Sequence, residues 1–329
     1  MRRLLLCLCL VLAAGLAQAQ QPWNQAQIRQ WFDAGQFGEI ESTYARVLAA
    51  RTRNRWGEFQ TEEILRVLTV PTSTATTASL SLLEEKAQDW WSRDMAPLAC
   101  IVRATLILRR LDLLGRSAPW TAVEAQVRDA AGLLVQAQAA STRDPNWHAA
   151  QLEVARLEGW EDARLWPALR AATRAEPWAL SPYLAALRTL AEDNRQGLER
   201  TLEMAAYALS LTSASEGSSM YARIMLRAPR WFQPLRSDPF AAGHIQWPLM
   251  HQGLKDLEAR YPGIYPLNHH AALACLAGDK GATTLLLGRV GAQPVAREWE
   301  FWGGKTLHER CKTWIQMPDQ PPAKVASKT

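Results

Sequence analysis

The sequence predicts an all-α protein: a degenerate helical-repeat array of stacked helix hairpins, tetratricopeptide-like, with a compact, loop-rich helical cap at the C-terminal end. Three observations lead to this fold class. Apolar residues recur at helical spacing in nearly every segment. No run alternates apolar and polar residues with β-branched enrichment, so we expect no sheet of any size. Pro145 and Pro177 lie 32 residues apart, close to the tetratricopeptide period of about 34, although the full consensus is not met.

The first element in the chain is a predicted signal peptide, residues 1–19. Arg2 and Arg3 precede an apolar run of about 13 residues, which is shorter than the roughly 20 residues that cross a bilayer. A small-x-small motif follows, and we expect cleavage between Ala19 and Gln20. The pattern predicts a bacterial protein that is periplasmic or secreted.

Charge and composition argue against two classes of partner. Removal of the leader leaves 35 basic and 32 acidic residues, a net charge of +3, which is too small for the basic face of a nucleic-acid-binding protein. The most apolar later segment, residues 100–114, is interrupted by three arginines and an aspartate. We therefore expect no membrane span after signal removal.

Three cysteines remain once the leader is removed: Cys100, Cys275 and Cys311. In an oxidising compartment this number suggests one disulfide and one free thiol. We favour a disulfide between Cys275 and Cys311, because Cys100 lies in an apolar-patterned segment where a buried thiol behaves as a small hydrophobic group.

Helical patterns follow one another through the N-terminal half. Two apolar stripes between residues 28 and 48, separated by a Gly-Gln-Phe turn, predict a helix hairpin. The polar stretch at residues 71–77 (PTSTATT) can cap a helix that runs through residues 80–91. Apolar stripes at residues 101–114 and 123–134 predict two further helices.

The middle of the chain holds a clear hairpin pattern. Residues 147–157 predict one helix, and Gly159 allows the left-handed turn that ends it. The returning helix stops before Pro177, because proline cannot continue it. Ser181 and Pro182 predict the start of the next helix, with the serine as the cap and the proline in the first helical position.

Prolines become frequent after Arg227 and separate shorter predicted helices. We therefore expect a helical-repeat region at residues 20–228 and a helical cap at residues 229–316, within the same contiguous domain. Residues 317–329 carry prolines and lysines and are predicted to form a disordered tail.

Fifteen tryptophans suggest either packing or sugar binding. Glycan-binding proteins use indole rings as stacking platforms. Here the rings are scattered from Trp23 to Trp314, mostly at helix ends or in apolar stripes, where a large ring fills the gap between hairpins. We expect packing for most of them.

Two C-terminal motifs imitate functional sites. Residues 303–306 (GGKT) resemble the end of a phosphate-binding loop, but Trp299 occupies the position of its first glycine and no strand precedes it. His308 and Cys311 are three residues apart, which suits a metal or a thiolate nucleophile, but a disulfide would consume the thiol.

The remaining titratable residues form no recognisable site. His269 and His270 are adjacent and cannot converge on one metal from a helix, and His244 with His251 is too sparse to complete one. The chain contains neither a GxSxG nor an HExxH motif. We therefore predict no catalytic, cofactor-binding or metal-binding residues and no cofactor.

Several short stretches occur in a distinctive order. They are Pro71-Thr72-Ser73, Trp90-Trp91-Ser92-Arg93, Pro145-Asn146-Trp147, Gly159-Trp160, Tyr221-Ala222-Arg223-Ile224, Trp231, Arg260-Tyr261-Pro262, Asn268, Cys275, Cys311 and Trp314. This order resembles a bacterial family called Domain of Unknown Function 4034, over roughly Tyr44 to Trp314. The resemblance implies a helical, tetratricopeptide-like fold and no established activity. The sequence departs from the family at Asp94, where a glycine is expected.

The function predicted from these features is an exported scaffold of the cell envelope that binds a protein or peptide along a concave surface. Two alternatives remain open. One is an envelope enzyme that cleaves glycans with a buried glutamate as the acid, for which Glu41, Glu153 or Glu203 is a candidate. The other is a tryptophan-rich module that binds glycans without cleaving them.

Overall fold

Helices account for all the regular secondary structure of the described residues, which confirms the predicted all-α class. The computed structural model describes residues 23–115, 119–193, 196–241, 243–292 and 294–317. Within these ranges the only β-type pairing is an isolated bridge between Arg53 and Phe59. The predicted signal peptide with its cleavage site, and the predicted tail from residue 318 onward, lie outside them.

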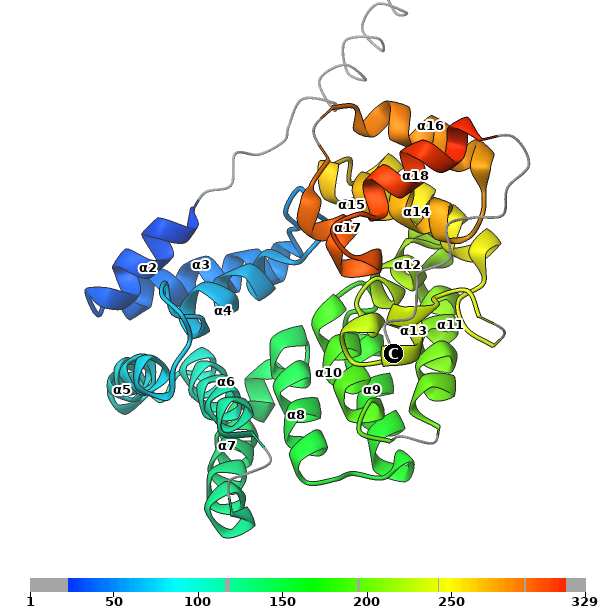
Figure 1. Cartoon of the computed structure of the whole chain (residues 1–329). Helices are drawn as coiled ribbons and strands as arrows, with labels where there is room; N and C mark the ends of the chain where they lie inside the picture. Colours follow the sequence, from blue (N-terminus) through cyan, green and yellow to red (C-terminus); the bar gives the residue numbers. More distant parts are fainter. Residues whose placement is uncertain (1–22, 116–118, 194–195, 242, 293, 318–329) are drawn as a thin grey trace, which may run out of the picture.

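The helices follow one another along the chain and are labelled in Figure 1. Their bounds are α2 (Gln25–Asp33), α3 (Phe37–Ala50), α4 (Gln60–Thr69), α5 (Thr77–Asp94), α6 (Pro97–Leu114), α7 (Trp120–Ser141), α8 (Pro145–Leu157), α9 (Asp162–Ala175), α10 (Leu180–Leu190), α11 (Gly197–Glu216), α12 (Ser219–Met225), the 3₁₀-helix η2 (Ala228–Arg230), α13 (Gln233–Ser237), α14 (Trp247–Arg260), α15 (Ile264–Leu276), α16 (Lys280–Val290), α17 (Ala296–Gly303) and α18 (Leu307–Gln316).

The N-terminal hairpin forms as the apolar pattern predicts. Helix α2 buries Ile28 and Phe32, and α3 buries Ile40 and Tyr44. The turn between them passes through Gly35, whose φ of 67° is strained for other residues. The structure adds α4, which was not predicted, between this hairpin and the polar stretch at residues 71–77.

Local capping fixes the start of α5. The Thr76 side chain accepts a hydrogen bond from the Ser79 N–H at 3.1 Å, and the Ser79 side chain accepts one from the Thr76 N–H at 2.9 Å. This reciprocal arrangement satisfies two of the N–H groups at the helix start that have no partner within the helix. The predicted capping role of the polar stretch is thereby confirmed.

The predicted central hairpin corresponds to α8 and α9. Gly159 has a φ of 67° and lies in the turn after α8, and α9 stops two residues before Pro177. The start of α10 was predicted at the wrong residue: Ala179 is the N-cap and Ser181 lies in the first turn. The Ser181 N–H is satisfied from outside the helix, because it donates to Glu62 on α4 at 2.8 Å.

Helices that are neighbours in the chain pack together along most of the fold. Helices α5, α6 and α7 pack in succession, α8 packs on α7 and α10, and α12, α14 and α15 continue the array. In Figure 1 the chain passes from the blue N-terminal hairpin through the green middle helices to the orange and red helices at the upper right. The red and orange helices lie near the end of α3, so the array curves back toward its start.

The buried apolar side chains form two clusters that meet at α8. One cluster extends from Trp23 to Val154 and the other from Leu152 to Trp314. The second cluster continues past residue 228, so the predicted repeat region and cap share a core. Six of the fifteen tryptophans are buried, seven are half-buried and only Trp120 and Trp231 are exposed. Most of the half-buried rings pack against one of the two clusters, so most indole rings pack within the protein, as expected.

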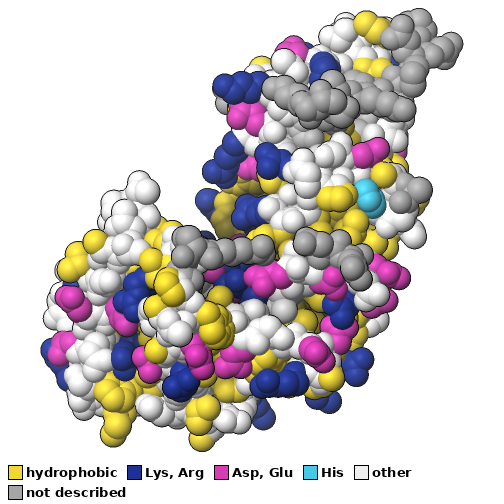
Figure 2. Space-filling view, turned by 60° about the horizontal axis from the view of Figure 1, so that its bottom comes forward, with side chains coloured by type: hydrophobic (Ala, Val, Ile, Leu, Met, Phe, Trp, Pro, Cys, Tyr) yellow, Lys and Arg dark blue, Asp and Glu magenta, His cyan; other side chains and the backbone are white. Residues whose placement is uncertain are grey.

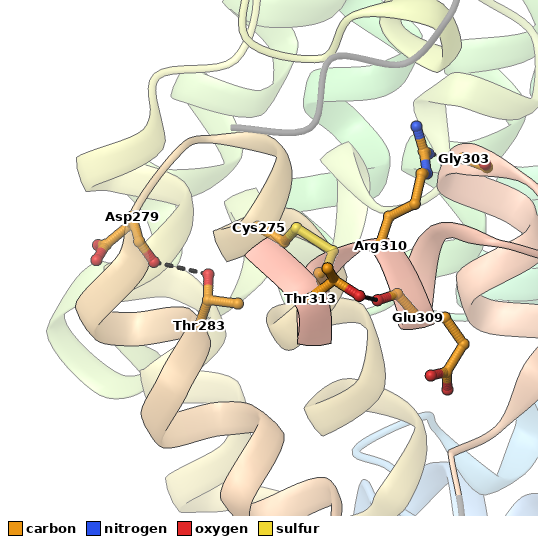
Figure 3. The surroundings of a disulfide bond; sticks show 8 residues. Cys275, Asp279, Thr283, Gly303, Glu309, Arg310 and Thr313 are labelled. Atoms are coloured by element: carbon orange, nitrogen blue, oxygen red, sulfur yellow. Dashed lines mark hydrogen bonds between the residues drawn. A yellow bond between two sulfur atoms is a disulfide. The ribbon is translucent and has the colours of Figure 1, made fainter. Parts of the chain in front are cut away.

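A disulfide joins Cys275 on α15 to Cys311 on α18, the pairing favoured from the sequence (Figure 3). The two sulfur atoms are 2.02 Å apart, and the cysteines are separated by 36 residues. Cys100 is a buried free thiol on α6. The disulfide therefore ties α18, the last of the described helices, to a helix within the second core.

Residues 51–59, between α3 and α4, attach the N-terminal hairpin to the C-terminal half. We call them the latch loop. Arg53 forms an ion pair with Glu216 at the end of α11, and Arg223 on α12 donates to the Gly57 carbonyl at 3.1 Å. Gly57 has a φ of 73°, and a Cβ atom there would collide with the Arg223 guanidinium. The latch loop therefore closes the curved array.

Candidate functional site

A cleft of about 660 Å³ lies where the latch loop meets α12, α15 and α17. Its lining combines arginines with aromatic and apolar side chains, and we call it the arginine cleft. The lining residues are Trp56, Glu58, Arg66, Leu180, Arg223, Leu226, Arg227, Arg230, Leu257, Tyr261, Tyr265, Pro266, His269, Arg297, Glu298 and Phe301. Figure 2 shows Lys and Arg side chains along one flank of the C-terminal helices, where the surface is hollowed beside the N-terminal half.

Three of the arginines in the arginine cleft have partners within the protein. Arg66 pairs with Glu58 at 2.8 Å, and Arg297 pairs with Glu298 at 2.7 Å. Arg223 is buried and donates to two backbone carbonyl groups of the latch loop. Its burial lowers its pKa. Arg223 therefore supports the wall of the cleft, and the other two are paired with glutamates.

Arg227 and Arg230 differ from these three, because within the described residues neither guanidinium forms an ion pair or a hydrogen bond. Helix α12 ends at Met225, and η2 brings both side chains to the cleft. Arg227 is partly buried and Arg230 is exposed. Burial is the main cause that lowers the pKa of Arg227, and the positive charge of Arg230 adds to it. Arginine nonetheless stays charged in proteins, so Arg227 is a partly desolvated cation. The carboxylates of Glu58 and Glu298 favour its charge from a distance, but no carboxylate among the described residues pairs with it directly.

The acidic side of the cleft is held by a short chain of hydrogen bonds. The Trp302 indole N–H donates to His269 Nδ1 at 2.9 Å, and His269 Nε2 contacts a Glu298 carboxylate oxygen at 2.8 Å. An indole N–H can only donate, so Nδ1 accepts and the proton is on Nε2. The hydrogen bond from His269 is the largest cause that lowers the pKa of Glu298, to about 2. Glu298 is therefore ionised near neutral pH and is not a general acid.

Aromatic rings form the apolar wall of the arginine cleft. Trp56 of the latch loop and Tyr265 on α15 meet edge to face with centroids 5.6 Å apart. The Arg297 guanidinium lies 4.8 Å from the Tyr265 ring, and that of Arg223 lies 5.0 Å from the Tyr261 ring. These cation–π contacts hold the rings in place. A fixed aromatic wall beside an excess of guanidinium groups is suited to binding an anionic ligand.

The three glutamates considered as possible catalytic acids do not line the arginine cleft. Glu41 accepts a hydrogen bond from an indole N–H at 2.6 Å, and Glu203 is exposed. Burial raises the pKa of Glu153, but this carboxylate is paired with Arg156 and Arg188. No observation on these residues favours glycan cleavage.

The histidines and Cys311 are engaged in contacts of their own. The His270 ring contacts Glu258 through Nδ1 and His251 through Nε2, the latter at 2.9 Å. Cys311 is in the disulfide, so it offers no thiolate beside His308. The described part of the chain contains no group of three or more His, Cys, Asp or Glu side chains that could hold a metal ion.

The GGKT stretch lies between two helices. Helix α17 ends at Gly303, Gly304 has a φ of 79°, and α18 begins at Leu307. The preceding element is therefore a helix and not the strand of a phosphate-binding loop.

The sequence alone does not predict the arginine cleft. Its charged residues come from the latch loop, α4, α12, η2 and α17, which are far apart in the chain. The only local signal is the spacing of Arg227 and Arg230 around a proline, which alone does not distinguish a binding site from an exposed turn.

Comparison of the chain with protein-family models, with curated proteins and with solved structures finds no significant match. None of the helices in the described ranges has the length and apolar character needed to cross a bilayer.

Proposed function

We propose that the protein is an exported helical scaffold that binds a protein or peptide of the bacterial cell envelope in the arginine cleft. One observation carries this proposal: the partly buried guanidinium of Arg227 has no acceptor among the described residues. Removing a charged group from water is costly unless it is paired. A site that retains such a cation is suited to a ligand that supplies the missing acceptor.

Export is the second part of the proposal, and it rests on the predicted signal peptide. The disulfide between Cys275 and Cys311 supports it, because disulfides persist in oxidising compartments such as the periplasm and the extracellular space. We therefore propose that the protein acts in the periplasm or outside the cell.

The family assignment also remains a proposal. The helical fold agrees with what the resemblance to Domain of Unknown Function 4034 implies, but no family model matches the chain. The stacked helices likewise agree with a tetratricopeptide-like array, whose concave face commonly binds peptides.

Site-specific photo-crosslinking in the cells that produce the protein tests the function. A photoreactive phenylalanine analogue replaces Tyr265, which is 37% exposed and lines the arginine cleft, or Val135, which is 68% exposed on α7 and serves as the control position. We expect a reproducible adduct with an envelope protein or peptide from position 265 and none of the same mass from position 135.

The same crosslinking experiment is repeated with two matched charge variants. Arg227→Gln removes the cation of the cleft, and Arg128→Gln removes an exposed cation on α7 that pairs with Glu124. We expect R227Q to abolish the adduct and R128Q to leave it unchanged. An adduct that persists in R227Q, or that forms equally from position 135, would refute binding in the arginine cleft.

A further inference from the structure

The charges of the arginine cleft define the chemistry of its ligand. Five arginines and two glutamates line the cleft, an excess of three positive charges. Both glutamates are already engaged, Glu58 with Arg66 and Glu298 with His269 and Arg297. The three excess charges are those of Arg223, Arg227 and Arg230. Arg223 donates to backbone carbonyls of the latch loop, so Arg227 and Arg230 are the cations to which a ligand can supply an acceptor.

The apolar wall adds a second requirement. Tyr261, Tyr265 and Phe301 line the same cleft as the two arginines. Aromatic rings of this kind contribute binding energy when an apolar or aromatic group of the ligand covers them. A bare inorganic anion would occupy the arginines and leave this wall exposed to water.

On the basis of the proposed function, we infer that the arginine cleft selects an acidic peptide segment. An Asp or Glu carboxylate of this segment binds Arg227, and a neighbouring aromatic side chain packs on Tyr265. A guanidinium group can hold a carboxylate through two parallel hydrogen bonds, which gives orientation as well as affinity. Arg230, three residues further along, is placed to hold a second carboxylate of the same segment.

The volume of the arginine cleft and the net charge of the chain favour a short peptide over a nucleic acid as the ligand. A volume of about 660 Å³ is in the range of sites that enclose a ligand of a few residues or a small molecule. Nucleic-acid binding needs an extended basic surface that neutralises many phosphates, whereas the chain without its leader carries a net charge of only +3. A neutral glycan offers no charge for Arg227.

Fluorescence anisotropy with synthetic peptides tests this inference on the full mature protein. The probe is a fluorescein-labelled, C-terminally amidated peptide containing Glu-Phe-Glu between glycine and serine residues. The matched peptides carry Gln-Phe-Gln or Glu-Ala-Glu at the same positions. We expect the Glu-Phe-Glu peptide to bind about tenfold or more tightly than either matched peptide.

Protein variants test whether the Glu-Phe-Glu peptide binds in the arginine cleft. R227Q should remove the preference for glutamate over glutamine, and R227K, which keeps the charge but not the planar fork, should retain part of it. R128Q, with the same loss of charge outside the cleft, should bind like the wild type. Far-ultraviolet circular dichroism of each variant verifies that the helical fold is intact.

Two outcomes would overturn the inference. The first is equal affinity for the Glu-Phe-Glu and Gln-Phe-Gln peptides, or a preference that survives in R227Q. The second is tight binding of a phosphoserine peptide or of inorganic phosphate without binding of the Glu-Phe-Glu peptide, which would assign the cleft to phosphate. If the crosslink at position 265 depends on Arg227 while the acidic peptides fail, the proposed function stands and only this ligand class is wrong.

Discussion

At the scale of single residues, the carboxyl group of Asp144 links the N-terminal hairpin to α8. The Tyr44 hydroxyl on α3 donates to Asp144 at 2.7 Å, and Asp144 also accepts the Asn146 N–H at 2.9 Å as the N-cap of α8. Burial is the main cause that raises the pKa of Asp144 to about 6, although the hydrogen bonds oppose it. Burial thus makes the protonated form of Asp144 more favourable in the folded state than in the unfolded chain.

This raised pKa predicts a pH-dependent stability. Protonation of Asp144 stabilises the fold fully below the pKa of the unfolded chain, and the contribution is lost as pH rises through about 6. The unfolding free energy of the wild type, relative to Asp144→Asn, should therefore fall by about 2 to 3 kcal/mol between about pH 4 and pH 7. Urea denaturation of both proteins across this range measures the difference. Parallel pH profiles would show that Asp144 is not perturbed.

At the scale of elements, the latch loop depends on a glycine. An alanine at position 57 would combine a strained positive φ with a collision against Arg223 and the Tyr261 ring. We expect Gly57→Ala to lower the unfolding free energy by about 2 to 4 kcal/mol. Gly159→Ala is the matched control, because Gly159 has a similar φ of 67° but no neighbour within 4 Å of an added Cβ. It should cost only about 1 kcal/mol, and an equal loss in both variants would mean that the collision does not matter.

The disulfide is the second element-scale feature with a measurable effect. In the chain-entropy account, a crosslink across 36 residues stabilises the fold by about 3 to 4 kcal/mol. We expect the double variant Cys275→Ser, Cys311→Ser to lose stability of this size in urea denaturation. Reduction of the wild type by dithiothreitol should have the same effect, and dithiothreitol should leave the double variant unchanged. If dithiothreitol leaves the urea denaturation of the wild type unchanged, even though the unfolded chain is accessible to it, the bridge does not form in solution.

At the scale of the whole molecule, the sequence predicts those features that neighbouring residues determine. Thr76 caps the residues that follow it, and Gly159 and Pro177 mark helix ends through their own backbone geometry. The apolar surroundings of Cys100 in the sequence favour pairing of the other two cysteines. Local patterns do not predict long-range contacts: Ser181 lies in the first turn of α10, and its N–H donates to Glu62 on a distant helix. The arginine cleft is not predicted for the same reason. No local pattern specifies which arginines meet in the fold, or which of them lack an acceptor among the described residues.

Closure of the array by the latch loop limits how this architecture can vary. An open solenoid of hairpins gains or loses a unit at little cost, because each unit contacts only its neighbours. Here the Arg53–Glu216 ion pair and the hydrogen bond from Arg223 to Gly57 join the latch loop to α11 and α12, which follow it much later in the chain. Duplication or deletion of one helix pair between them would move these partners apart and open the mouth of the cleft. Evolutionary change in the length of this protein should therefore fall in its loops and at its ends, while the number of hairpins in the turn stays constant.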